Sequence, residues 1–384
     1  MNRISYGRQN ITQDDIDSVV ETLKSDYLTQ GPLVMEFERK FADYVGAKYA
    51  VAVSNGTAAL HISNLAMGVK KGDKVITTPI TFIASANSVL YCDGEIHFVD
   101  IDKNTYLLDL DKLEEKLNEL PYGTYKGVIP VDFAGYPLDV ERLRKIANKH
   151  GLWIIEDACH APGGYFFDSQ KKKQLCGNGQ YSDLQVFSFH PVKHIACGEG
   201  GMVTTNNQKL YKKLLTLRTH GIQQDKSLLE ENHGIWYYEM QELGFNYRLT
   251  DIQCALGISQ LTRANKGLTK RQEIATIYDN AFKNNPNITT PFREMNIFHA
   301  FHLYVIQTNN RDKLIKHLRD NNIFAQVHYI PIHLQQYYKK LGWKKGDMPI
   351  SEDYYSKALS LPLYPTLTRQ EQNFVIKKVL EICA

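Results

Sequence analysis

The sequence predicts an α/β fold in which a large domain with a seven-stranded, mostly parallel sheet precedes a smaller α+β domain. The chain has 384 residues, enough for two domains at roughly 150 residues each. Short apolar runs alternate with amphipathic helical patterns up to about residue 250, after which longer helical patterns dominate. We therefore expect a large domain at 1–250, which includes an N-terminal arm, and a small domain at 251–384.

The strand prediction rests on seven short apolar runs, at 49–53, 74–78, 96–101, 127–131, 153–156, 184–189 and 201–205. Helical patterns separate several of them, for example at 110–120 and 140–150. Nearly continuous apolar strands that alternate with helices indicate a parallel sheet covered on both faces.

The flanking segments complete the expected architecture. Thr12 and Asp15 form a capping-box pattern ahead of a first helix, whose residues Ile16, Val19, Val20 and Leu23 share one face. A second helix follows, with Val34, Phe37, Phe41 and Val45 facing inward. In the small domain we expect a long helix at 249–282, strands at 301–308 and 324–329, and helices at 311–320 and 369–382.

Composition argues against several classes of function. The 45 basic and 42 acidic residues give a net charge of +3, too balanced to indicate a nucleic-acid or membrane partner. The six cysteines form no Cys-x-x-Cys pair, so we expect no metal site and free thiols in a reducing cytosol. With no secretory signal and no apolar stretch of roughly 18 residues, we expect a cytoplasmic protein.

Ligands of open parallel sheets bind beyond the carboxyl ends of the strands, so the residues there are candidates for a site. The run at 49–53 leads into Ser54, Asn55, Gly56 and Thr57, a turn of small residues before a helix. Free N–H groups at such a helix start bind phosphate. An ordinary capped turn is the alternative reading.

Two further signals fall at the same edge of the sheet. Asp157 follows the run at 153–156 and can pair with a protonated ring nitrogen or cap a helix. Lys193 follows the run at 184–189 among apolar residues, where a desolvated lysine can form a Schiff base, although a lysine that reaches solvent is the commoner case. A phosphate cradle, a carboxylate and a lysine match the phosphate, ring nitrogen and aldehyde of pyridoxal 5'-phosphate (PLP). The sequence therefore predicts a PLP site with Lys193 as the catalytic residue.

Five motifs occur in order over nearly the whole chain: Ser54-Asn55-Gly56-Thr57-Ala58-Ala59-Leu60, Thr78-Pro79-Ile80-Thr81-Phe82, Glu156-Asp157-Ala158-Cys159-His160-Ala161, Phe187-Ser188-Phe189-His190-Pro191-Val192-Lys193 with Gly198-Glu199-Gly200-Gly201, and Gly244-Phe245-Asn246-Tyr247-Arg248-Leu249-Thr250-Asp251. As a set they resemble the DegT/DnrJ/EryC1/StrS sugar aminotransferases. A narrower resemblance, to the aminotransferases of pseudaminic acid biosynthesis, is carried by Ser5-Tyr6-Gly7, Leu28-Thr29-Gln30-Gly31 and Ala325-Gln326-Val327-His328-Tyr329-Ile330-Pro331. The resemblance implies the PLP-dependent aminotransferase fold of type I.

The resemblance also implies a role for each matching residue. Lys193 would bind the cofactor covalently, and Asp157, with His160 nearby, would hold its ring nitrogen. Phe82 would stack on the ring. The phosphate would be contacted by Gly56, Thr57 and Ser188, by the turn residue Ala58 where many relatives carry a hydroxyl group, and by Asn246 of the neighbouring subunit in a homodimer with shared active sites. The nucleotide sugar would contact Tyr6, Leu28, Thr29, Gln30, Gly31, Gln326, Val327, His328 and Tyr329.

The implied reaction is a ping-pong amino transfer. L-Glutamate would give its amine and leave as 2-oxoglutarate, and the 4-keto group of a UDP- or dTDP-linked 6-deoxy sugar would accept it, preferably a UDP-linked N-acetyl hexose. A sugar dehydratase would carry histidine in place of Lys193. A non-catalytic PLP-binding regulator would carry a basic helix-turn-helix segment, which we do not see before Tyr6 or after Ile382. A nicotinamide oxidoreductase would need Gly-x-Gly-x-x-Gly after its first strand, where Ser54-Asn55-Gly56-Thr57 stands.

Overall fold

A seven-stranded sheet forms the centre of this computed structural model, which describes residues 3–383. Its strands lie in the order β2-β10-β9-β6-β5-β3-β4. They span β2 Tyr49–Val53, β3 Lys74–Thr77, β4 Glu95–Phe98, β5 Gly127–Ile129, β6 Trp153–Asp157, β9 Leu184–Ser188 and β10 Gly201–Thr205. Strand β10 is antiparallel to both neighbours, and the other pairings are parallel. The predicted sheet is confirmed, although the runs expected at 96–101 and 127–131 stop as strands at Phe98 and Ile129.

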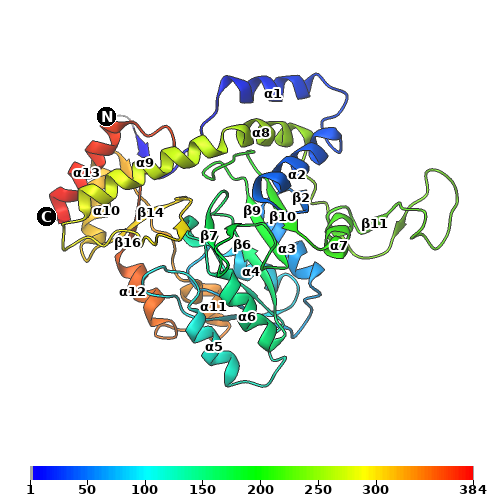
Figure 1. Ribbon diagram of the computed structural model, residues 1–384, viewed down its shortest axis with the longest axis horizontal. Helices are drawn as coiled ribbons and strands as arrows, with labels where there is room; N and C mark the ends of the chain where they lie inside the picture. The colour runs from blue at the N-terminus through cyan, green and yellow to red at the C-terminus, as the bar shows by residue number, and fades with distance from the viewer. Residues whose placement is uncertain (1–2, 384) are drawn as a thin grey trace.

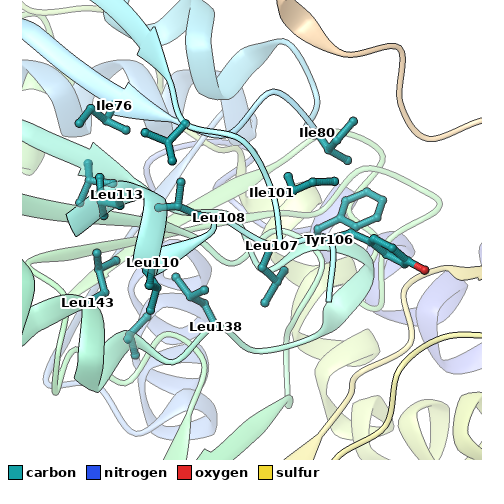
Figure 2. Packing of buried hydrophobic residues seen from close by; sticks show 14 of the residues in the cluster. Ile76, Ile80, Ile101, Tyr106, Leu107, Leu108, Leu110, Leu113, Leu138 and Leu143 are labelled. Carbon is teal, nitrogen blue, oxygen red and sulfur yellow. The ribbon is translucent and has the colours of Figure 1, made fainter. Parts of the chain in front are cut away.

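Helices cover both faces of this sheet. Successive strand residues point to opposite sides, and apolar residues on each side are buried against a different set of helices. Ile76 and Val128 face a cluster that includes residues of α5 Leu110–Asn118 and α6 Val140–His150. Figure 2 shows Ile76, Leu108, Leu113 and Leu143 gathered in this layer. The adjacent strand residues Val75 and Ile129 face the opposite cluster, built with α3 Gly56–Ala66, α4 Ala84–Leu90 and α7 Gln208–Arg218.

The N-terminal helix α1, Gln13–Leu23, has the predicted capping box of Thr12 and Asp15. It lies along α8, Asp251–Thr262, at one edge of the molecule (Figure 1), and α2, Pro32–Val45, also packs against α8. The apolar residues Ile16, Val20 and Leu23 of α1 are 48%, 39% and 55% exposed. The apolar stripe read from the sequence therefore faces outward in the single chain.

The single helix expected at 249–282 is wrong. It is divided into α8, Asp251–Thr262, and α9, Ala264–Phe282, by the non-helical Arg263 (φ −116°, ψ 11°). The Arg263 guanidinium donates to Asp15 Oδ1 at 2.8 Å and to the carbonyl oxygen of Asn10 at 2.8 Å. The residue at the break is thus held by an ion pair with Asp15 of α1, so no local pattern at 249–282 could have predicted that the helix is interrupted there.

The small domain gathers α9, α10 Arg311–Asp320 and α13 Arg369–Cys383 around two antiparallel strands, β14 Tyr304–Gln307 and β16 Ala358–Leu361. The N-terminal strand β1, Ile4–Ser5, pairs in parallel with β15, Ile323–Phe324. The strand expected at 324–329 is thus wrong beyond Phe324, since only an isolated bridge from Gln326 to Ser360 continues it. The domain boundary at 250/251 stays a prediction.

Several short elements have no counterpart in the predictions. They are a small sheet of β7 Tyr165–Phe167, β8 Lys173–Leu175 and β13 Ile297–Phe298, the pair β11 Ile222–Gln223 and β12 Glu239–Met240, the helices α11 Gln336–Lys340 and α12 Pro349–Lys357, and the 3-10 turns Phe133–Gly135 and Ile332–Leu334. The β11–β12 segment extends from the body as an arm (Figure 1). No helix within residues 3–383 combines the length and apolarity needed to cross a membrane.

Candidate active site

A cavity of about 720 Å³ opens where β6 and β9 end, at the sheet edge that the sequence singled out. Asp157, Ser188 and Lys193 line one part of it, while Tyr6 and Tyr329 line another from the N-terminal arm and the small domain. Its volume is typical of sites for small molecules and cofactors. The site therefore lies between the two parts of the chain.

The predicted phosphate turn is built as a cradle at the start of α3. Asn55 caps the helix and accepts the N–H of Ala58 at 2.8 Å, whereas no described residue accepts from the N–H of Gly56 or Thr57. A Cβ on Gly56 would lie 3.0 Å from Ser188 Cβ, so the turn packs closely on the end of β9. All five of these residues line the cavity. Free N–H groups at a helix start beside a hydroxyl fit a phosphate.

Asp157 is positioned by two hydrogen bonds. Its Oδ2 accepts from Ser85 Oγ at 2.7 Å, and its Oδ1 accepts from the backbone N–H of Cys159 at 3.2 Å. Asp157 is 5% exposed and lines the cavity. A carboxylate held rigidly at this place can bind a protonated pyridine nitrogen.

Lys193 stands on the wall of the same cavity. Its backbone N–H donates to the carbonyl oxygen of His190 at 2.8 Å, which fixes the turn after β9. Burial lowers the pKa of its amine, and the charges of Cys159 and Asp157 oppose that effect only in part. A lysine with a lowered pKa is a better nucleophile and proton acceptor near neutral pH.

His160 is held in one tautomer. The N–H of Ala134 donates to its Nδ1 at 3.2 Å, so the neutral ring carries its proton on Nε2, which lies 3.3 Å from the Tyr329 hydroxyl. Burial, and then the charge of Lys193, lowers the pKa of His160 well below its usual value. The ring is therefore a neutral hydrogen-bonding group that ties Tyr329 to the cofactor side of the cavity.

Aromatic residues from distant segments form the rest of the wall. The rings of Tyr6 and His328 lie 4.9 Å apart, and those of Phe82 and Tyr329 lie 6.2 Å apart. Phe82 is 55% exposed and lines the cavity, so its side chain is accessible to a ligand there. Burial lowers the pKa of His328 to about 3, and its Nδ1 lies 2.8 Å from Ser360 Oγ.

The structure does not bring every predicted residue to this cavity. Its lining excludes Leu28, Thr29, Gln30, Gly31, Asn246, Gln326 and Val327. Gly31 instead donates its N–H to Asp251 Oδ2 at 2.8 Å, and Asn246 forms a bridge with Thr219. Gln326 lines a neighbouring groove. The roles of these residues stay predictions.

Other residues of the site were not foreseen. Ser85 orients Asp157, Cys159 lies beside Lys193, and the His302 ring lies 4.3 Å from that of His160. Tyr247 also lines the cavity and binds the turn, because its carbonyl oxygen accepts from Ser54 N–H at 2.8 Å. The only indication in the sequence that Tyr247 belongs to the site was its place next to Asn246 in the motif at 244–251.

The described residues also include a buried group with metal-ligand chemistry: Asp132, Glu156 and Cys176 have ligand atoms within 4.8 Å of one another. Burial raises the pKa of both carboxyl groups, and the charge of Glu156 raises that of Asp132 further. The prediction of no metal site stays a prediction.

Fold and cavity together define a PLP-dependent aminotransferase of fold type I. The chain belongs to the DegT/DnrJ/EryC1/StrS aminotransferase family, whose model matches residues 9–380. It is 38% identical to the spore coat polysaccharide biosynthesis protein SpsC of Bacillus subtilis, over 99% of this chain and 97% of that one. It is 37% identical to the UDP-4-amino-4,6-dideoxy-N-acetyl-beta-L-altrosamine transaminase of Campylobacter jejuni, over 97% of this chain and 95% of that one.

Solved structures agree with this assignment. PseC of Helicobacter pylori, an aminotransferase of pseudaminic acid biosynthesis, superposes with a TM-score of 0.88 at 32% identity, covering 100% of this chain and 99% of that one. The PLP form of the putative sugar aminotransferase Spr1654 of Streptococcus pneumoniae superposes with a TM-score of 0.90 at 27% identity, covering 99% and 98%. The prediction of a PLP-dependent sugar aminotransferase is confirmed.

Proposed function

We propose that this chain transfers the amino group of L-glutamate to C4 of a UDP-linked 4-keto-6-deoxy-N-acetyl hexose, as in pseudaminic acid biosynthesis. One observation carries the proposal: the cofactor residues Asp157 and Lys193 share one cavity with Tyr6, His328 and Tyr329. Hydroxyl and imidazole groups on that wall suit a sugar with several hydroxyls. The names of the Campylobacter and Helicobacter relatives support the choice of sugar.

The residues divide the chemistry between them. When bound, PLP accepts the electron pair left as a C–H bond next to the amine breaks. Asp157 keeps the ring nitrogen protonated, and Ser85 keeps Asp157 in place. Lys193 would hold the cofactor and, once its amine is free, would move a proton at the reacting carbon as a buried base. Gly56, Thr57 and Ser188, which line the same cavity, would anchor the phosphate.

The test is a steady-state assay with glutamate and the UDP-linked keto sugar, with the product identified by mass spectrometry and NMR. We expect a 4-amino sugar and 2-oxoglutarate in equal amounts. The relative involved in spore coat polysaccharide favours a second candidate, another UDP- or dTDP-linked 4-keto-6-deoxy sugar. Other UDP-linked and dTDP-linked 4-keto-6-deoxy sugars in the same assay distinguish the two, since turnover only with one of those substrates would refute our choice.

We further propose that the active unit is a cytoplasmic homodimer in which the partner supplies Asn246 to the phosphate. The exposed stripe of α1 and the β11–β12 arm, in which Ile235 and Trp236 are 95% and 69% exposed, offer apolar surface for a second copy. The six cysteines are free, as in a reducing compartment.

Subunit complementation tests this arrangement. Lys193→Ala and Asn246→Ala should each be inactive alone. A shared site predicts that mixed dimers regain roughly a quarter of the wild-type activity, since half are hybrid and each hybrid has one intact site. A mixture that stays inactive, although subunit exchange is shown by labelled chains, would contradict the shared site.

A further inference from the structure

A second groove, of about 330 Å³, adjoins the active-site cavity. It forms where β1 pairs with β15, with Ser5 opposite Phe324. Ile4, Ile323 and Ala325 are fully buried in the small-domain core. Because strand residues alternate, Ser5, which follows Ile4, and Phe324, between Ile323 and Ala325, face the groove. The groove is therefore fixed by the core packing beneath it.

Two arginines dominate the groove. The guanidinium carbons of Arg3 and Arg319 lie 4.3 Å and 4.6 Å from the centre of the Phe324 ring. Arg319 donates one hydrogen bond, from Nη2 to the carbonyl oxygen of Ala325 at 3.2 Å. Within residues 3–383, neither guanidinium lies within ion-pair distance of a carboxylate. Both cations are oriented by stacking, and most of their N–H donors remain available to a ligand.

The groove and the active-site cavity share a wall residue, Tyr6. Gln326 lines the groove, and His328 and Tyr329, two and three residues further on, line the cavity. The cavity with Lys193 and the groove with the two arginines are therefore neighbours that meet at Tyr6. In a nucleotide sugar, the group that extends from the sugar is a diphosphate on its anomeric carbon.

We propose that Arg3 and Arg319 bind the diphosphate of the nucleotide-linked substrate in this groove. The inference rests on the proposed function, because it assigns the anionic part of the same substrate. Guanidinium groups form paired, charge-assisted hydrogen bonds to phosphate oxygens. The groove would thus distinguish a nucleotide sugar from the free sugar, which lacks the diphosphate.

The direct test uses UDP as the probe, with the PLP-loaded protein and isothermal titration calorimetry. The wild type should bind UDP, and uridine much less. Arg3→Gln with Arg319→Gln should weaken UDP binding by roughly 10-fold or more, since each substitution removes charged hydrogen bonds. The control is Lys316→Gln, an exposed cation on the same helix α10 that does not line the groove; it should bind UDP as the wild type does.

Kinetics separate this inference from the proposed function. The double variant should raise KM for the nucleotide sugar about as much as it weakens UDP binding, with kcat and the reaction with glutamate unchanged. If no nucleotide sugar is aminated, the proposed function fails, and UDP binding still decides whether the groove is a diphosphate site. Absent UDP binding by the wild type, or equal binding by the double variant, would overturn the inference.

Discussion

Gly201 supports the phosphate turn, and its replacement by alanine should weaken PLP binding. It begins β10, where it pairs with Val53 and with Ser188. A Cβ at this position would lie 2.5 Å from the carbonyl carbon and oxygen of Asn55 and 2.9 Å from the N of Gly56. These are backbone atoms, so no side-chain rotation can relieve the contact.

The size of the effect follows from these distances. Ordinary contact begins at about 3.4 Å, so the turn must retreat by about 0.9 Å. Overpacking of this kind costs about 1–3 kcal/mol. If this free energy is lost entirely from cofactor binding, PLP affinity should drop roughly 5- to 150-fold. A displacement near 1 Å at a catalytic site can also lower turnover by about 10²-fold.

The assay is a PLP titration of the apo-protein, followed by absorbance, with thermal unfolding measured in parallel. The control is Gly267→Ala in α9, where the nearest atom to a new Cβ is Pro365 Cγ at 3.7 Å; it should bind PLP normally and gain stability slightly, by up to about 1 kcal/mol. If Gly201→Ala bound PLP as tightly as the wild type, the close contact between β10 and the turn at 54–57 would not determine the geometry of the phosphate cradle.

Three further predictions follow from the same structure. Lys193→Ala should lower amino transfer by at least about 10³-fold with an unchanged melting temperature; residual turnover near the wild type would exclude Lys193 as the catalytic residue. Asp15→Ala should destabilise the fold by about 3–5 kcal/mol, because it leaves Arg263 without its buried partner, whereas the exposed Asp14→Ala should change denaturant stability little. Glu156→Gln should flatten the pH dependence of stability. Because the pKa values of Asp132 and Glu156 are raised in the folded chain, the pair keeps a proton that the unfolded chain loses. The free energy of unfolding of the wild type should therefore fall as pH rises above about 4, with a slope of up to about 1.4 kcal/mol per pH unit for each such proton. Equal slopes for wild type and Glu156→Gln in urea unfolding would show that Glu156 holds no such proton in the folded chain.

Local patterns were sufficient for much of the fold and for the cofactor half of the site. The seven apolar runs match strands, and Asp157 and Lys193 meet because parallel strands end at one edge of the sheet. The capping box of Thr12 likewise depends only on neighbouring residues.

Features that depend on tertiary contacts could not be predicted from the sequence. The helix break at Arg263 depends on Asp15, which lies far away along the chain. Strands of two or three residues, such as β7 and β8, are too short to show periodicity. His302 reaches the site only through the packing of the small domain. The outward face of α1 could not be told from a buried one, because an apolar stripe has the same period in a core and in an interface.

One measurement tests the central claim most directly: the absorbance spectrum of the PLP-loaded protein, recorded alone, after L-glutamate, and after the UDP-linked 4-keto sugar. We predict that glutamate replaces the band of lysine-bound PLP by that of pyridoxamine phosphate, and that the keto sugar restores it. Lys193→Ala should show neither change. A band of lysine-bound PLP that is indifferent to glutamate, or a pyridoxamine phosphate band that the keto sugars leave unchanged, would contradict the assignment of this chain as a nucleotide-sugar aminotransferase.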